Sequence, residues 1–137
     1  MVQFYFLSIL FNGLAGYYLI SGDEEGLSES RSKLSLLPLK DETFKLILGI
    51  LTLIAALFKV IFPMEKVWII GDLFPAVAGF AAGFILVYEY YKGRAAVEEE
   101  SSGASFVSFL LRNKKIFGFV ALAAAALHFL VPSALIL

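Results

Sequence analysis

The chain has 137 residues, of which 60% are hydrophobic and 15% aromatic, and its formal net charge is −1. Soluble domains are usually about 45–50% apolar, and here the excess is gathered into long runs, which is typical of integral membrane proteins. The near-zero net charge gives no basic field for nucleic acid, so we expect no nucleic-acid partner. The absence of cysteine excludes disulfides and thiolate sites, a single histidine argues against a protein-only zinc site, and we expect no cofactor and no metal.

The first apolar run, residues 2–20, predicts a membrane-spanning helix. No lysine or arginine precedes it, so it lacks the basic segment of a secretory signal and is interpreted as a retained span. Asn12 lies near its middle. Ser8 and Asn12 share one face of this helix with Ala15 or Gly16.

The second span is predicted over residues 44–62 and is closed by Pro63. A polar connection, residues 21–43, precedes it, and its leucine-rich and basic second half is either a short helix in the headgroup layer or a solvated loop. Asp41 and the two residues after it suit a helix start, where free N–H groups need acceptors. One face of the span carries small and polar residues: Gly49, Thr52, Ala56 and Lys59.

The third span is predicted over residues 67–91, and a turn of four residues makes it an antiparallel hairpin with the second. It contains Asp72, and an acid at the middle of a span costs about 3 kcal/mol on insertion scales. We therefore expect Asp72 to face protein rather than lipid. Its helix face also carries small residues that permit close packing: Ala76, Gly79 and Gly83.

A second polar connection, residues 92–113, again runs from an acidic half to an apolar and basic half, which suggests another helix at the membrane surface. The fourth span is predicted over residues 115–136. Its small-residue face ends in the single histidine of the chain and comprises Gly118, Ala121, Ala125 and His128. The expected fold is therefore an all-α integral membrane bundle of four transmembrane helices.

The second and fourth spans match when shifted by 69 positions, which predicts a tandem duplication with units of about 1–66 and 67–137. An even number of spans in each unit gives both copies the same orientation. The alternative is chance, since glycine, alanine and leucine are common in membrane helices. The matched positions are Lys45 and Lys114, Gly49 and Gly118, Lys59 and His128, and Pro63 and Pro132.

The distribution of lysine and arginine predicts the orientation. Nearly all of these residues lie in or beside the two long connections, and Lys66 is the exception between spans. Because basic residues favour the cytoplasmic side, both connections are expected in the cytoplasm and both termini outside. The expected location is a bacterial cytoplasmic membrane.

Three ionisable residues are expected at similar depth, about 6–9 Å inside the non-cytoplasmic ends of their helices: Lys59, Asp72 and His128. We predict that they meet, with Asn12 deeper in the bundle. Such a cluster could bind a solute or ion or carry protons. The structural alternative is that Lys59 pairs with Asp72 to fasten the hairpin while His128 bonds a backbone carbonyl.

A glycine, an apolar run, a basic-type residue and a proline recur as Gly49–Lys59–Pro63 and Gly118–His128–Pro132. This pattern resembles helices of small bacterial DoxX-like membrane proteins. The resemblance covers two of the four expected spans, and it implies no activity, cofactor or site residue for this chain.

The favoured function is that of a transporter or channel-like subunit using the polar cluster. The alternative is an accessory or scaffold subunit of a larger membrane complex, docked through its glycine and alanine faces. An enzyme with His128 as acid or base is the least favoured class, because no catalytic motif accompanies it. The expected partners are the lipid bilayer and either a second copy of the chain or a larger complex.

Overall fold

A computed structural model describes residues 2–21, 41–62, 73–94 and 104–130 of the chain. These residues form five α-helices and no strand: α1 (Val2–Ser21), α2 (Glu42–Ile61), α3 (Leu73–Arg94), α4 (Ala104–Arg112) and α5 (Lys114–Leu130). The all-helical class predicted from the sequence is confirmed. Asp72, the turn after Pro63 and most of the first polar connection lie outside the described residues, as does Pro132.

Three helices, α1, α2 and α3, are long and apolar enough to cross a membrane. A fourth span results if α4 and α5 are counted together, although the chain bends by 71° between them. By itself α5 has 17 described residues. The observed helices agree closely with the predicted ones, since α2 starts two residues before the predicted span and α1 ends one residue after it.

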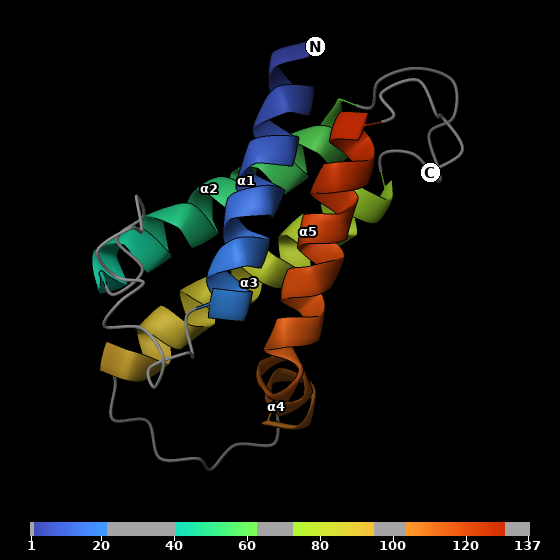
Figure 1. Ribbon diagram of the computed structural model, residues 1–137. Helices are drawn as coiled ribbons and strands as arrows, with labels where there is room; N and C mark the ends of the chain where they lie inside the picture. Colours follow the sequence, from blue (N-terminus) through green and yellow to red (C-terminus); the bar gives the residue numbers. More distant parts are fainter. Residues whose placement is uncertain (1, 22–40, 63–72, 95–103, 131–137) are drawn as a thin grey trace, which may run out of the picture.

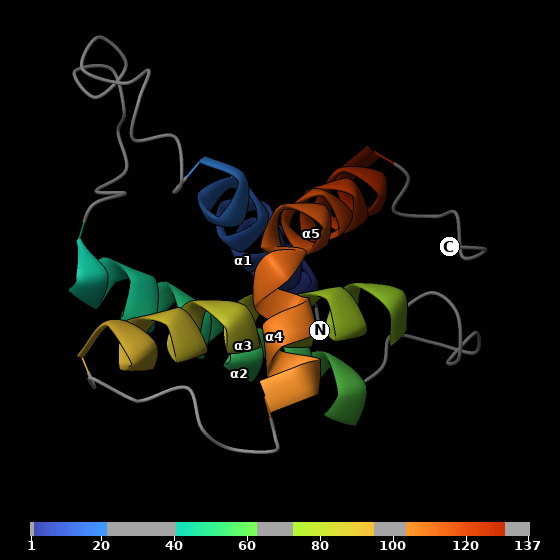
Figure 2. The ribbon, with the colours of Figure 1, turned by 90° about the horizontal axis from the view of Figure 1, so that it is seen from below.

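The long helices form two antiparallel pairs, α1 with α5 and α2 with α3, and the two pairs cross (Figure 1). Seen from below, each pair makes one layer of the bundle (Figure 2). We call the end that holds the start of α1 and the last turns of α2 and α5 the upper end. The opposite end, which holds the starts of α2 and α5, is the lower end.

A glycine contact joins the helices within each pair. A methyl group built on Gly16 of α1 would lie 2.6 Å from the carbonyl oxygen of Gly118 on α5. In the other pair, a methyl group built on Gly83 of α3 would lie 2.9 Å from the carbonyl oxygen of Gly49 on α2. Backbone meets backbone at both sites, so only glycine permits this approach. Of the glycines predicted to mediate helix packing, Gly49, Gly83 and Gly118 lie in these contacts, whereas Gly79 lies against Asn12 of α1 and Ala56 of α2.

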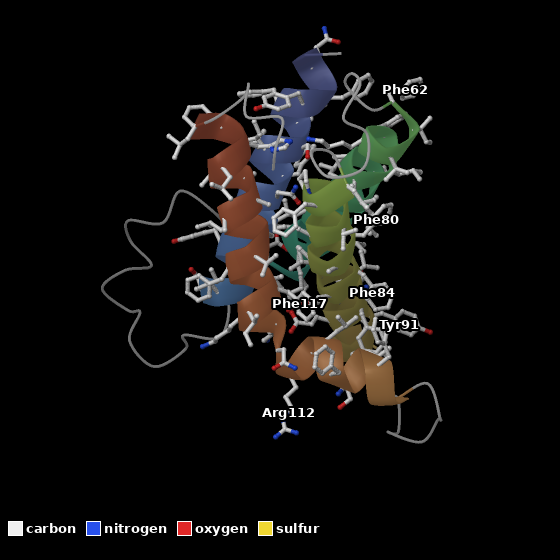
Figure 3. All side chains as sticks on the ribbon, turned by 90° about the vertical axis from the view of Figure 1, so that its right-hand side faces the viewer. Phe62, Phe80, Phe84, Tyr91, Arg112 and Phe117 are labelled. Carbon is white, nitrogen blue, oxygen red and sulfur yellow. The ribbon has the colours of Figure 1, made fainter. Side chains whose placement is uncertain are left out.

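The interior of the bundle is small and polar, whereas its outside is large and apolar. The buried face of α2 is the predicted one and includes Gly49, Thr52, Ala56 and Lys59. The outward face of the same helix carries Ile47, Ile50, Ile54 and Leu57. Figure 3 shows Phe80 and Phe84 of α3 pointing away from the bundle in the same way. Large apolar side chains on the outside suit contact with lipid tails.

The lower end contains the short helix α4, which the second polar connection predicted. Asn113 separates it from α5: the Asn113 side chain donates a 2.8 Å hydrogen bond to the carbonyl of Phe109, and the Asn113 carbonyl accepts from Ile116 and Phe117. One residue thus ends α4 and begins α5, which accounts for the bend. Leu110 anchors α4 in the core, while Phe106 and Phe109 remain exposed.

Candidate functional site

The upper end brings Lys59 of α2 together with His128 of α5. The Lys59 Nζ atom lies 2.6 Å from His128 Nε2, and the lysine is only 4% exposed. Both residues lie on the small-residue faces from which their meeting was predicted. The third candidate, Asp72, lies outside the described residues. The structure therefore unites two of the three ionisable residues of the predicted cluster.

Tyr5 of α1 completes this site, and sequence reasoning did not single it out. Its hydroxyl donates to the backbone carbonyl of His128, and its ring stacks on the imidazole at 5.2 Å between centroids. Lys59 Nζ lies 5.3 Å from the centroid of the same ring, within the range of a cation–π interaction. Tyr5, Lys59 and His128, which we call the upper cluster, also take part in interactions beyond these.

The carbonyl of His128 has a sequence-based reason to accept from Tyr5. The residue four positions further along the chain is Pro132, which has no N–H and so cannot donate to this carbonyl in a continuing helix. A tyrosine hydroxyl from α1 supplies a donor instead. The signal in the sequence was the position of Tyr5 on the same helix face as Ser8 and Asn12.

Asn12 lies deeper in the bundle, as predicted, and is 3% exposed. Its Nδ2 atom donates to the carbonyl of Pro75 on α3 at 3.0 Å and lies 3.5 Å from Ser8 Oγ. Its Oδ1 atom has no hydrogen-bond partner among the described residues. Gly79 makes room for this amide, since a methyl group there would lie 2.8 Å from Oδ1.

The lower end holds a different polar group, an ion pair between Lys114 of α5 and Glu89 of α3 at 2.7 Å. Each side chain is about one-fifth exposed. Glu89 was not singled out from the sequence, and this pairing was not predicted. Apart from Lys59, the described lysines and arginines all lie at this end (Figure 3 labels Arg112): Lys45, Lys92, Arg94, Arg112, Lys114 and Lys115.

An open apolar groove of about 380 Å³ runs along the outside of the α1·α5 pair. Gly13, Ala126 and the exposed Phe129 are among the residues that line it. The described residues that line it are all glycine or apolar. The groove lies on the outward side of the pair, whereas Lys59 and His128 meet on the side that faces α2.

The upper cluster contains two bases and a phenol, and these are groups that hold and exchange protons. Within the described residues there is no group of three or more histidine, cysteine, aspartate or glutamate side chains that could hold a metal ion. An amine and an imidazole in contact can share one proton, because one donates while the other accepts.

The fold and site thus define a class: small all-helical proteins with three or four helices of membrane-spanning length and a buried lysine in contact with a half-buried histidine. The model of an uncharacterised protein family matches residues 1–128, and the chain belongs to that family. It is also similar to an uncharacterised protein of Treponema pallidum (strain Nichols), with 31% identity over 138 residues and full coverage of both chains. No solved structure matches.

Proposed function

We propose that this protein is a multi-pass membrane protein of four spans and a transporter or channel-like subunit that moves a small solute or ion past the upper cluster. The single observation that carries this proposal is the contact between the buried Lys59 and the half-buried His128, which lies among helices whose outward faces are apolar. A basic side chain inside a membrane helix is costly, and such residues commonly mark ion or solute pathways.

The outward faces of the helices support residence in a bilayer. On the described helices, isoleucine, leucine and phenylalanine are exposed along α2, α3 and α5, while most alanines of these helices are buried, as are Gly49, Gly79, Gly83, Gly118 and Thr52. In water this arrangement would expose a large apolar surface, whereas in lipid it carries no such penalty. The bent pair of α4 and α5 would then provide the fourth span, with α4 at the surface.

The position of the cations supports an orientation with the lower end in the cytoplasm. Lys59 is the one lysine or arginine that the described residues place at the upper end, and it is buried rather than facing a loop. By the positive-inside tendency, the lower end faces the cytoplasm and both termini face outward. The upper cluster would then be reached from the non-cytoplasmic side of the membrane.

A tandem duplication of a two-helix unit is the origin we propose for this bundle. Gly49 and Gly118, 69 positions apart, each pack on a glycine of the partner helix, Gly83 and Gly16, which are 67 positions apart. Their other neighbours correspond in the same way. Leu53 and Leu122 face Gly83 and Gly16, while Leu86 and Leu19 face Gly49 and Gly118. Lys59 and His128 occupy equivalent positions in this scheme.

The transport proposal is tested with the protein in lipid vesicles on a sensor that records charge movement. Concentration jumps of potassium chloride, sodium chloride and sodium acetate, and a pH jump at constant salt, are the probes. We expect at least one jump to produce a current that is lost in the Lys59→Met/His128→Phe double variant. Identical currents in the two proteins, or none in the wild type, would contradict the proposal.

The groove on the α1·α5 pair favours a second function, docking on a larger membrane assembly. It is apolar, and the small residues Gly13, Ala125 and Ala126 line part of it, which lets another helix approach closely. A Gly13→Phe variant would fill it, since a methyl group built there makes only an ordinary 3.7 Å contact with Ala125. We expect the wild type to migrate as a larger assembly than this variant in mild detergent, and equal sizes would discard docking through the groove.

A further inference from the structure

Lys59 and His128 belong to different helix pairs, and their contact joins the two layers of the bundle. Among the described residues, α2 packs on α3 and α1, while α5 packs on α1, α3 and α4. The backbones of α2 and α5 make no close approach of their own. The Lys59–His128 contact is therefore a side-chain link between the last turns of two helices whose backbones do not meet.

The charge of this contact depends on its protons. At 2.6 Å the two nitrogens can share one proton, with Lys59 donating to the neutral imidazole. A second proton binds to the lone pair of His128 Nε2, which removes the acceptor and leaves two cations in contact. Like charges at this distance repel strongly where little water screens them. Release of that proton restores the hydrogen bond, so the two states differ by one proton.

Among the described residues, the helices packed against both α2 and α5 are α1 and α3. From α1, Tyr5 stacks on the imidazole and lies under Lys59 Nζ. The upper half of α3, from Leu73 to Ala82, contributes no titratable side chain. Asp72 immediately precedes that half in sequence and lies outside the described residues, so it enters the experiment as a variant of its own.

We infer that the coupling ion of this protein is the proton, and that the Lys59–His128 contact carries it: binding of a second proton separates the upper ends of α2 and α5, and its release draws them together. This inference rests on the proposed transport function and names its substrate class. Tyr5 acts as a positioning residue, because its hydroxyl and ring hold His128 in line with the amine.

The experiment measures the distance between the upper ends of the two helices. The chain has no cysteine, so a pair introduced at the exposed positions Ile61 and Leu130 can be spin-labelled cleanly. In lipid vesicles, we expect this distance to lengthen when the pH falls from about 8 to about 5, the range in which histidine changes charge. A matched pair at Ile47 and Ile116, at the lower end, should stay unchanged.

Variants assign the response to the pair. In His128→Gln, which keeps a polar side chain but binds no proton, and in Lys59→Met, the lengthening should vanish. Tyr5→Phe should keep it but displace its midpoint. A response that persists in both His128→Gln and Lys59→Met while vanishing in Asp72→Asn would overturn the inference and assign the switch to the acid.

Proton uptake into vesicles, followed with an internal pH-sensitive dye under a potassium diffusion potential, separates the two proposals. Uptake in the wild type that is lost in His128→Gln supports both. Salt-driven currents without a pH-dependent distance would leave transport standing and discard the proton as its coupling ion. A pH-dependent distance without current or uptake would keep the proton-driven movement but discard transport.

Discussion

The two ends of this bundle each bring a buried or half-buried lysine onto a neighbouring helix, but the lysines meet opposite kinds of partner. At the lower end, Lys114 pairs with the carboxylate of Glu89 at 2.7 Å. At the upper end, Lys59 meets the imidazole of His128 at 2.6 Å. An ion pair keeps its charges across neutral pH, whereas two bases in contact must divide protons between them. We infer from this comparison that the lower end stabilises the bundle and that the upper end responds to pH.

The largest effect on stability is expected from disrupting the contact between α1 and α5. In Gly16→Leu the new side chain would collide with the backbone of Gly118 and Leu122, which cannot move aside. We expect a loss of about 3 kcal/mol or more, at the upper range for overpacking. Unfolding in mild detergent measures it. Gly93→Leu is the matched control, because no atom lies within 4 Å of a methyl group there, and equal losses would contradict the assigned contact.

The upper pair is tested by a double-mutant cycle. His128→Phe removes a hydrogen-bond partner from a lysine that is 4% exposed, which should cost about 2 kcal/mol. Lys59→Met should cost less, because it removes the buried charge itself. The double variant should recover most of the stability that His128→Phe loses, as measured by thermal unfolding in detergent. Simple additivity of the two single effects would show that the residues are not coupled.

The lower pair should matter for stability but not for the response to pH. Glu89→Gln keeps the shape and removes one charge of an ion pair that is about one-fifth exposed, so we expect a loss of about 1 kcal/mol. Added salt should reduce the difference from the wild type. The distance between Ile61 and Leu130 labels should change with pH as in the wild type. Loss of the pH response in Glu89→Gln would mean that the upper end does not act independently of the lower ion pair.

The smallest effect is expected at the cap of α2. Asp41 accepts a 2.9 Å hydrogen bond from the backbone N–H of Thr43, as its place in the sequence predicted. Asp41→Ala should cost about 0.5 kcal/mol, the low end for an exposed cap. Hydrogen exchange should quicken in the first turn of α2 and stay unchanged near Lys59 at its other end. Faster exchange along the whole helix would contradict a local role.

Sequence reasoning located the helices because the physical signal was strong at each one. Long apolar runs fixed α1, α2 and α3, and small residues at helical spacing identified the faces that are buried. Lys59 and His128 could be paired in advance because both lie on those faces, at matching distances from Pro63 and Pro132. Each of these inferences needs only the residue pattern within one helix or the sequence match between two helices.

Contacts between particular helices were harder to foresee. The sequence gives no rule for which glycine meets which, so the contact of Gly16 with Gly118 emerged only from the structure. Tyr5 resembled an ordinary aromatic residue of a span, since its polar partner is a backbone carbonyl that leaves no mark in the sequence. The ion pair of Glu89 was not predicted either, because its partner Lys114 comes from another helix.

The most direct test uses the fact that His128 is the single histidine of the chain. Protein labelled with ¹⁵N-histidine therefore gives one imidazole signal, whose titration can be followed by magnetic resonance in lipid. If Lys59 and His128 share protons, the midpoint of this titration should move clearly in Lys59→Met and stay in place in the control Lys114→Met. The same midpoint in all three proteins would contradict a coupled pair and, with it, the response assigned to the upper end.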